Sequence, residues 1–161
     1  MPARLEWPDL LIEDSTLDHL ALLADWNWLL KGTFRVFAGS KFGDWFLERP
    51  GGTVDFLDAI EGTLRQVAPN VDEFRRLINT REKQEAWLLS HLVLACHGKG
   101  MVPGPRQCYG FKLPPVLGGG IELENIELLD LQLCVSLAGQ IHRQSVGLPE
   151  GTRITGFRIE E

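Results

Sequence analysis

The hydrophobic and polar positions along the chain fall into two patterns, and the first of them predicts helices. Apolar residues at helical spacing, or a capping box, mark helices at about 16–30, 71–79, 81–97 and 130–145. The third segment is apolar nearly all round at its centre, AWLLSHLVLAC, which predicts a buried helix. In the last segment, Gln132, Ser136, Gln140 and Arg143 form the predicted solvent face.

The second pattern consists of short runs of β-branched and aromatic residues between turn residues, which predicts strands. These runs are 33–38, 45–49, 53–57, 63–67, 109–113, 126–129 and 152–159. Pro50, Gly51 and Gly52 separate two of them and predict a hairpin. Residues 1–14 are predicted to be an irregular acidic lead. The pattern therefore indicates a single domain over residues 1–161 of the α+β class, with helices packed around an antiparallel sheet.

The stretch YGFKLPPVLGGGIELEN, residues 109–125, predicts a loop of fixed conformation. It places a pair of prolines and a run of three consecutive glycines among apolar residues. Gly118 and Gly119 suit positive φ angles, or a close approach of backbone to a packed helix. A phosphate cradle is the alternative, but it needs a helix N-terminus and a lysine. Here Glu122 and Glu124 follow instead, so an architectural role is favoured.

Composition and charge narrow the range of partners. The formal net charge of −6 disfavours direct binding to nucleic acid or an anionic membrane, and it suits a basic protein partner. The three cysteines are widely spaced without a CxxC motif, which favours a reducing cytoplasm. The chain contains neither a signal-peptide pattern nor an apolar run long enough to span a membrane. We therefore expect a cytoplasmic protein.

No residue constellation in the sequence predicts catalysis. The chain has no GxSxG, P-loop or HExxH motif. His91 and His97 are six residues apart, whereas chelation on one helix face needs a spacing of four. Asp55, Asp58 and Glu61 resemble exposed turn carboxylates. We therefore expect no enzymatic activity, no cofactor and no metal.

Two acidic clusters remain as candidates for binding a partner. Carboxylates of this kind either face solvent or form a docking surface whose charge speeds association with a basic protein. The first cluster is Asp9, Glu13, Asp14 and Asp18, and the second is Glu122, Glu124 and Glu127.

Several segments, taken in order, resemble a bacterial family related to the SUKH superfamily. The relevant relative is the C-terminal domain of immunity proteins that neutralise DNase effectors of type VI secretion. The matching segments are KFGDWFL at 41–47, NVDEF at 70–74, YGFKLP at 109–114, LGG at 117–119, ENI at 124–126, GQIH at 139–142 with Gln144, and LPEGT at 148–152. Within them, the residues assigned to structural motifs are Gly43, Asp44, Pro114, Gly118, Gly119 and Asn125.

The resemblance implies a SUKH-like α+β fold and a function in binding rather than catalysis. A cytoplasmic immunity protein that neutralises a bacterial toxin is the expected function, with a secreted nuclease as one candidate toxin. Two alternatives stay open: a small-ligand-binding or cryptic enzymatic domain at the glycine loop, and a general interaction module. The sequence leaves the oligomeric state undetermined.

Overall fold

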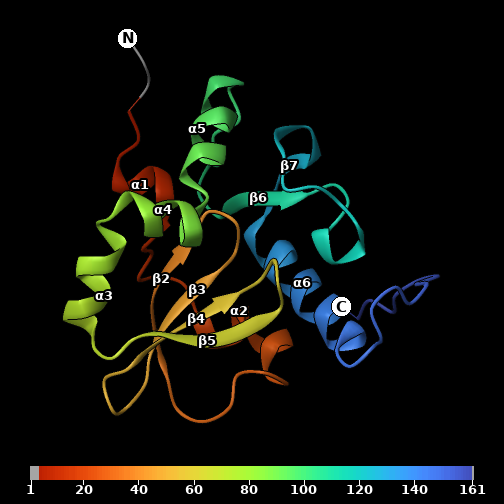
Figure 1. Cartoon of the computed structure of the whole chain (residues 1–161), viewed down its shortest axis with the longest axis horizontal. Helices are drawn as coiled ribbons and strands as arrows, with labels where there is room; N and C mark the ends of the chain where they lie inside the picture. Colours follow the sequence, from red (N-terminus) through yellow and green to blue (C-terminus); the bar gives the residue numbers. More distant parts are fainter. Residues whose placement is uncertain (1–3, 161) are drawn as a thin grey trace.

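A five-stranded antiparallel sheet forms the centre of the computed structural model, which describes residues 4–160 (Figure 1). The strand order is β1-β2-β3-β4-β5, so each strand pairs with its neighbour in the sequence. The strands are β1 Leu11–Ile12, β2 Arg35–Ser40, β3 Trp45–Glu48, β4 Val54–Asp58 and β5 Thr63–Ala68. The predicted α+β class, with an antiparallel sheet and surrounding helices, is confirmed.

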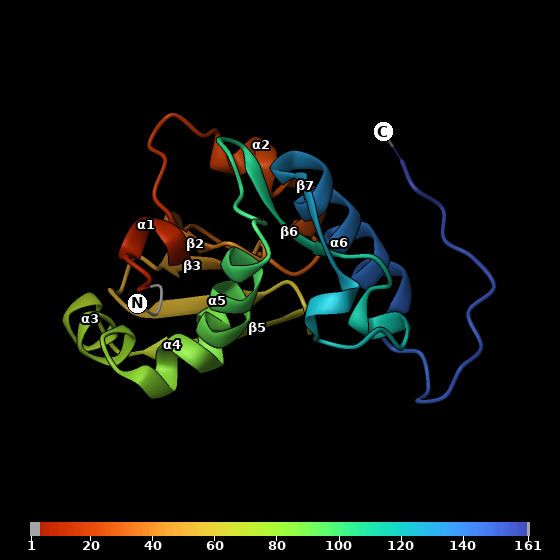
Figure 2. The same ribbon diagram turned by 90° about the horizontal axis from the view of Figure 1, so that it is seen from above.

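The sheet is buried on both faces, and alternate residues of one strand enter two different cores. In β3, Phe46 packs in one core, while Trp45 and Leu47 pack in the other. Figure 2 shows the covering helices on the two sides of the sheet. The first layer is α3 Val71–Ile78, α4 Arg81–Leu88 and α5 Ser90–Gly98; the second is α2 His19–Leu22, the 3-10 helix η1 Ala24–Trp26, and α6 Leu131–Ser145.

A second, two-stranded sheet carries the glycine-rich loop. It consists of β6 Gln107–Phe111 and β7 Ile126–Asp130, with the 3-10 helices η2 Pro115–Leu117 and η3 Leu123–Asn125 in the connection. The amide of Tyr109 donates to the carbonyl of Lys41 at 2.7 Å, which ties β6 to the turn between β2 and β3. The glycine-rich loop is thus anchored to the central sheet.

Side-chain caps hold the first turns of two of the predicted helices. The Asn70 side chain accepts from the Glu73 amide at 2.7 Å at the start of α3. Asp130 accepts from the Leu133 amide at 2.9 Å at the start of α6. Each bond satisfies an amide that has no partner within the helix.

The helix predicted over 16–30 is wrong, because the chain there forms only the short helices α2 and η1. Leu22, Leu23 and Trp26 are all buried, and turning the chain brings them to the core together. Upstream, the predicted irregular lead contains α1 Trp7–Leu10 and β1, apart from residues 1–3, which lie outside the described part. Pro8 in the first turn and a capping box between Glu6 and Asp9 favour α1.

The continuous helix predicted over 81–97 is also wrong, because it breaks at Leu89. This residue has φ of 51°, in the left-handed region, and separates α4 from α5. The carboxylate of Glu85 accepts from the His91 amide at 2.9 Å and from the Ser90 hydroxyl at 3.1 Å. Glu85 therefore caps α5 and holds the elbow, a role that apolar spacing does not reveal.

The strand predicted over 152–159 is wrong, because this segment bonds side chains of α6 instead of another strand. Residues 152–160 form no strand. Instead, the Gln140 amide bonds both backbone groups of Glu160, at 2.9 and 2.6 Å. Gln144 does the same for Arg158 at 2.5 and 2.9 Å. Gln140 is consequently only 1% exposed, which contradicts its predicted place on the solvent face.

Candidate functional site

The side chain of Asn125 fixes the conformation of the glycine-rich loop. Its Oδ1 accepts from the Leu113 amide at 2.9 Å, and its Nδ2 donates to the carbonyls of Leu113 at 2.8 Å and Gly120 at 2.9 Å. These three bonds imitate a strand pairing across the neck of the loop. The Pro114 carbonyl accepts from the amides of Leu117 and Gly119, at 2.9 and 3.1 Å. The glycine amides therefore do not form an open phosphate cradle.

Gly118 and Gly119 are required for different reasons. Gly118 has φ of 100°, a conformation that a Cβ atom disfavours. A Cβ on Gly119 would lie 1.7 Å from the carbonyl oxygen of Leu113 and 2.8 Å from Nδ2 of Asn125. The positive φ predicted for this loop is found at Gly118, whereas Gly119 lies against the backbone of Leu113 in the same loop rather than against a packed helix.

Alanine at Gly119 is expected to destabilise the protein more than alanine at Gly118. Gly118→Ala places a side chain at positive φ, which costs about 1–2 kcal/mol. Gly119→Ala also collides with backbone that cannot move without breaking the Asn125 bonds. Each kcal/mol lowers the melting temperature of a domain of this size by about 2–4 °C.

Thermal unfolding of both variants, with Gly51→Ala as the matched control, tests this ranking. A Cβ on Gly51 has nothing within 4 Å. Equal melting temperatures for Gly119→Ala and the control would contradict the assigned role.

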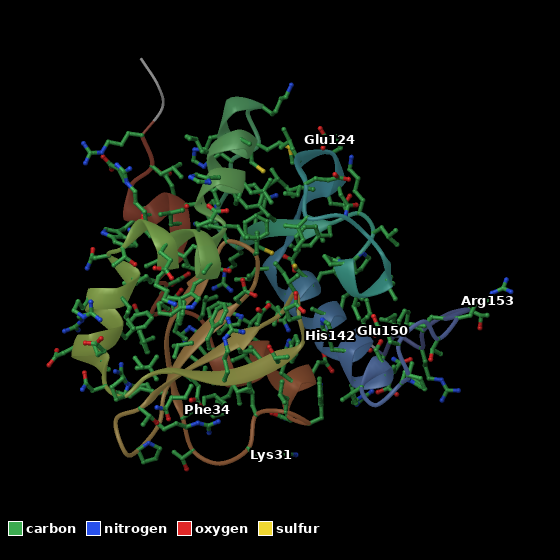
Figure 3. The ribbon with its side chains drawn as sticks, in the orientation of Figure 1. Lys31, Phe34, Glu124, His142, Glu150 and Arg153 are labelled. Carbon is green, nitrogen blue, oxygen red and sulfur yellow. The ribbon has the colours of Figure 1, made fainter. Side chains whose placement is uncertain are left out.

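The loop presents apolar side chains to solvent beside carboxylates. Leu113, Val116 and Ile121 are 48%, 37% and 47% exposed. The neighbouring carboxylates are those of Glu122, Glu124 and Glu127. Within residues 4–160, none of them lies within 4.0 Å of a basic side-chain nitrogen. Figure 3 shows Glu124 at the outer end of the molecule, near β7. The "glycine-loop surface" hereafter means Leu113, Val116, Ile121, Glu122, Glu124 and Glu127.

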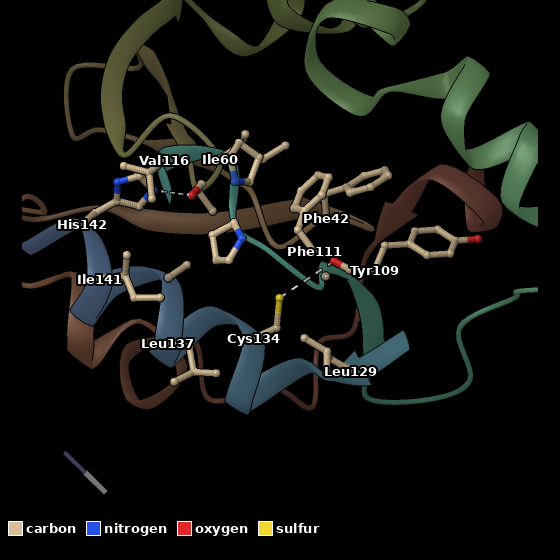
Figure 4. Close-up of a pocket in the computed structure, with 15 residues that line it drawn as sticks. Phe42, Ile60, Tyr109, Phe111, Val116, Leu129, Cys134, Leu137, Ile141 and His142 are labelled. Carbon is tan, nitrogen blue, oxygen red and sulfur yellow. Dashed lines mark hydrogen bonds between the residues drawn. The ribbon is translucent and has the colours of Figure 1, made fainter. Parts of the chain in front are cut away.

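A small apolar pocket lies between the glycine-rich loop and α6 (Figure 4). Its volume is about 100 Å³, and Phe111, Val116 and Ile141 are among its lining residues. A dry cavity of about 150 Å³ binds benzene, so this pocket suits one apolar side chain rather than a large cofactor. Such pockets receive the anchor residues of protein partners.

A buried hydrogen-bond network supports the floor of this region and explains the motif at Gly43 and Asp44. The Asp44 carboxyl group bonds the Ser40 hydroxyl at 2.6 Å and accepts from the Ala59 amide at 2.7 Å. His142, from α6, donates through Nε2 to the Ala59 carbonyl at 2.9 Å. Gly43 turns the chain with φ of 85°. The network joins the β2–β3 turn, the β4–β5 turn and α6.

Burial changes the protonation of this network. Burial, with a smaller contribution from the charge of Asp58, raises the pKa of Asp44 to about 7. Hydrogen bonds from Ser40 and from the amides of Ala59 and Ile60 oppose this rise in the pKa. Burial lowers the pKa of His142. Neither group is exposed to solvent, so the network has a structural role.

The first acidic cluster is largely committed to local structure. Asp9 accepts from the Glu6 amide at 2.8 Å, Asp14 from the Thr16 amide at 2.8 Å, and Asp18 from the Ala21 amide at 3.1 Å. The nearby charges of Lys41 and Arg106 partly offset these carboxylates. Glu13 is exposed and forms no ion pair with a basic side chain among the described residues.

The structure does not merge the two acidic clusters into one patch. Helix α5 contacts both α1 and η3 and lies between them (Figure 1). The apolar residues of the glycine-loop surface were absent from the predicted site. In the sequence they are apolar residues that alternate with prolines and glycines. Apolar residues of this kind cannot be distinguished from core residues until the fold is known.

The other candidate residues have structural surroundings. Asp55 pairs with Arg49 at 2.8 Å, and Asp58 accepts from the amides of Ile60 and Glu61 at 3.1 and 2.9 Å. Cys96 is buried in the core, and residues 4–160 contain no group of three His, Cys, Asp or Glu side chains placed to hold a metal ion. None of the helices described is both long enough and apolar enough to cross a bilayer.

One protein family matches part of the chain. Residues 68–142, from the end of β5 into α6, match the family described as T6SS immunity protein Tdi1, C-terminal. This match confirms the predicted resemblance to the C-terminal domain of type VI secretion immunity proteins. The glycine-rich loop lies within the matched residues.

One similar solved structure is the crystal structure of Atu4351 from Agrobacterium tumefaciens, with 16% sequence identity and a TM-score of 0.45. The alignment covers 75% of this chain and 60% of that chain. No curated protein matches the chain.

Proposed function

We propose that this chain, whose residues 68–142 match the family described as T6SS immunity protein Tdi1, C-terminal, binds and neutralises a secreted protein toxin. The observation that carries the proposal is the glycine-loop surface, in which a loop fixed by Asn125 holds exposed apolar residues beside free carboxylates. A rigid surface loses little conformational entropy on binding, which favours tight complexes. We place the complex in the cytoplasm of the toxin-resistant cell.

The mechanism we propose is occlusion, in which the bound chain covers the working surface of the toxin. Leu113, Val116 and Ile121 supply apolar anchors, and the pocket beside Val116 receives an anchor from the toxin. Glu122, Glu124 and Glu127 attract a basic surface. If the toxin is a nuclease, these carboxylates occupy positions that nucleic-acid phosphates take in its substrate complex.

The first acidic cluster has a secondary place in this proposal. Asp9, Asp14 and Asp18 already bond backbone amides, so their charge acts on an approaching toxin mainly over distance. Charge at a distance raises association rates and leaves dissociation rates nearly unchanged.

Co-expression with the toxin encoded beside this gene is the test of the function. The chain should protect cells from the toxin and form an isolable complex with it. Failure to protect, together with failure to bind the product of any neighbouring gene, would refute the immunity proposal.

The electrostatic part is tested by association kinetics at several salt concentrations. Replacing Glu122, Glu124 and Glu127 with glutamine should slow association about tenfold at low salt and flatten its salt dependence. At 1 M salt the Debye length is only about 3 Å, so variant and parent should then associate at similar rates. Glutamine at Glu82, Glu150 and Glu160 removes the same charge elsewhere; Glu150 lies apart from Glu124 (Figure 3). Equal slopes for both triple variants would contradict this mechanism.

A further inference from the structure

The outer edge of β2 is only half covered by a neighbouring strand. Strand β1 pairs Leu11 with Ser40 and Ile12 with Gly39, and the chain then leaves the sheet. Across the part of the chain that is described, no strand pairs with residues 35–38 on that side. An uncovered edge presents backbone donors and acceptors that can pair with another extended segment.

A groove of about 600 Å³ runs beside this uncovered edge. Residues of the N-terminal segment, of β2 and of α3 line it. Its apolar lining includes Leu11, Ile12, Val71 and Ile78. The groove therefore combines an unpaired strand edge with an apolar helix wall, as in domains that bind peptides by strand addition.

A β-bulge in β2 shapes the floor of the groove. Val36 pairs with Leu47 and Ala38 with Phe46, so Phe37 is an extra residue opposite β3. Phe37 and Ala38 consequently pack in the same core, whereas a regular strand would place them on opposite faces. The Phe37 ring packs edge-on against Phe74 of α3, with 5.2 Å between centroids. Phe37 thus joins the strand edge to the helix wall.

The walls of the groove carry charges of both signs. Glu13 and Asp14 come from the N-terminal segment, whereas Arg35 and Arg75 come from β2 and α3. Arg35 and Arg75 have side chains that are 67% and 72% exposed, and their ion pairs to Glu48 and Asp72 are on the surface. These arginines can therefore exchange their partners at little cost.

We propose that a short extended segment of the toxin adds to β2 along residues 35–38 and fills this groove. The inference rests on the proposed function for the identity of the partner. The segment spans about four residues, or about 13 Å of strand. Its backbone pairs with the β2 edge, and alternate apolar side chains contact Phe37 and Phe74. A basic side chain faces Glu13, and an acidic one faces Arg35 or Arg75.

Hydrogen exchange of the chain, alone and bound to a catalytically inactive form of the co-encoded toxin, tests strand addition. Those amides of residues 35–38 that point outward should exchange at least about tenfold more slowly in the complex. A complex that leaves exchange in this segment unchanged would overturn strand addition and leave the immunity function intact. Absence of any complex would refute both, so the two failures can be told apart.

Steric blocking provides a second measurement. Ser15 is exposed and lines the groove, so Ser15→Cys labelled with a polyethylene glycol maleimide should obstruct it. Labelled Gln66→Cys, exposed on β5 at the opposite edge of the sheet, is the matched control. We expect toxin affinity to fall at least tenfold for the first conjugate and not for the second. Equal affinities for the two conjugates would overturn the proposal.

Discussion

Replacing Asp44 with asparagine is expected to flatten the pH dependence of folding stability between about pH 4 and pH 7. Burial and the charge of Asp58 raise the pKa of Asp44 from 3.8 to about 7 in the folded protein. Between these two values the folded protein holds a proton that the unfolded chain has lost. The stability linked to this proton is complete below the unfolded pKa and is lost as the pH rises through the folded pKa.

The size of this effect follows from the shift. Each pKa unit corresponds to about 1.4 kcal/mol, so the pH-dependent contribution of Asp44 is on the order of a few kcal/mol. Asparagine keeps an oxygen for the Ala59 amide and cannot ionise. Urea unfolding at several pH values measures the slope. Asp72→Asn, whose parent side chain is 96% exposed, is the control and should retain it. An unchanged slope in Asp44→Asn would contradict the assignment.

Replacing Leu113 and Ile121 together with serine is expected to weaken toxin binding on the order of 1,000-fold. Both side chains are nearly half exposed on a loop that Asn125 holds in place. Apolar anchors at the centre of an interface contribute at least about 2 kcal/mol each when they are truncated. Because the side chains are exposed in the free protein, the substitution removes little of the folded core.

Calorimetry with the co-encoded toxin measures this loss, and Leu20→Ser is the matched control. Leu20 is 70% exposed and lies on α2, away from the glycine-rich loop in the sequence and in the fold. The double variant should keep the parent melting temperature within a few degrees. Unchanged affinity in a folded double variant would show that the toxin docks elsewhere.

Local sequence signals predicted those elements whose stabilising contacts are also local. The Pro50–Gly52 turn and the Asn70 cap act within a few residues, so the β3–β4 hairpin and α3 were predictable. The break at Leu89 was not, because it depends on a carboxylate cap from Glu85 and on packing against the sheet. The apolar periodicity of residues 81–97 fits a continuous helix as well as it fits two helices that meet at Leu89.

The candidate site was predictable to a similar degree. We could assign architectural roles to Gly118, Gly119 and Asn125 from the sequence. Glycine and asparagine within an apolar run usually mark a turn or an unusual backbone conformation. The exposure of Leu113 and Ile121 was not predictable, since the same residue types form the core. The uncovered edge of β2 depends on where β1 ends. Because β1 has only two residues, it shows no alternating pattern from which its end could be predicted.

The contacts of Gln140 and Gln144 with residues 158 and 160 determine which substitutions these two positions tolerate. Both glutamines hold the segment by its main chain alone, so side chains at these two positions can drift without loss of its path. Proline is the exception, because it removes the amide that each glutamine oxygen accepts from. Relatives of this protein can therefore vary the chemistry displayed along this edge, and thereby acquire new recognition properties, while the scaffold beneath stays the same.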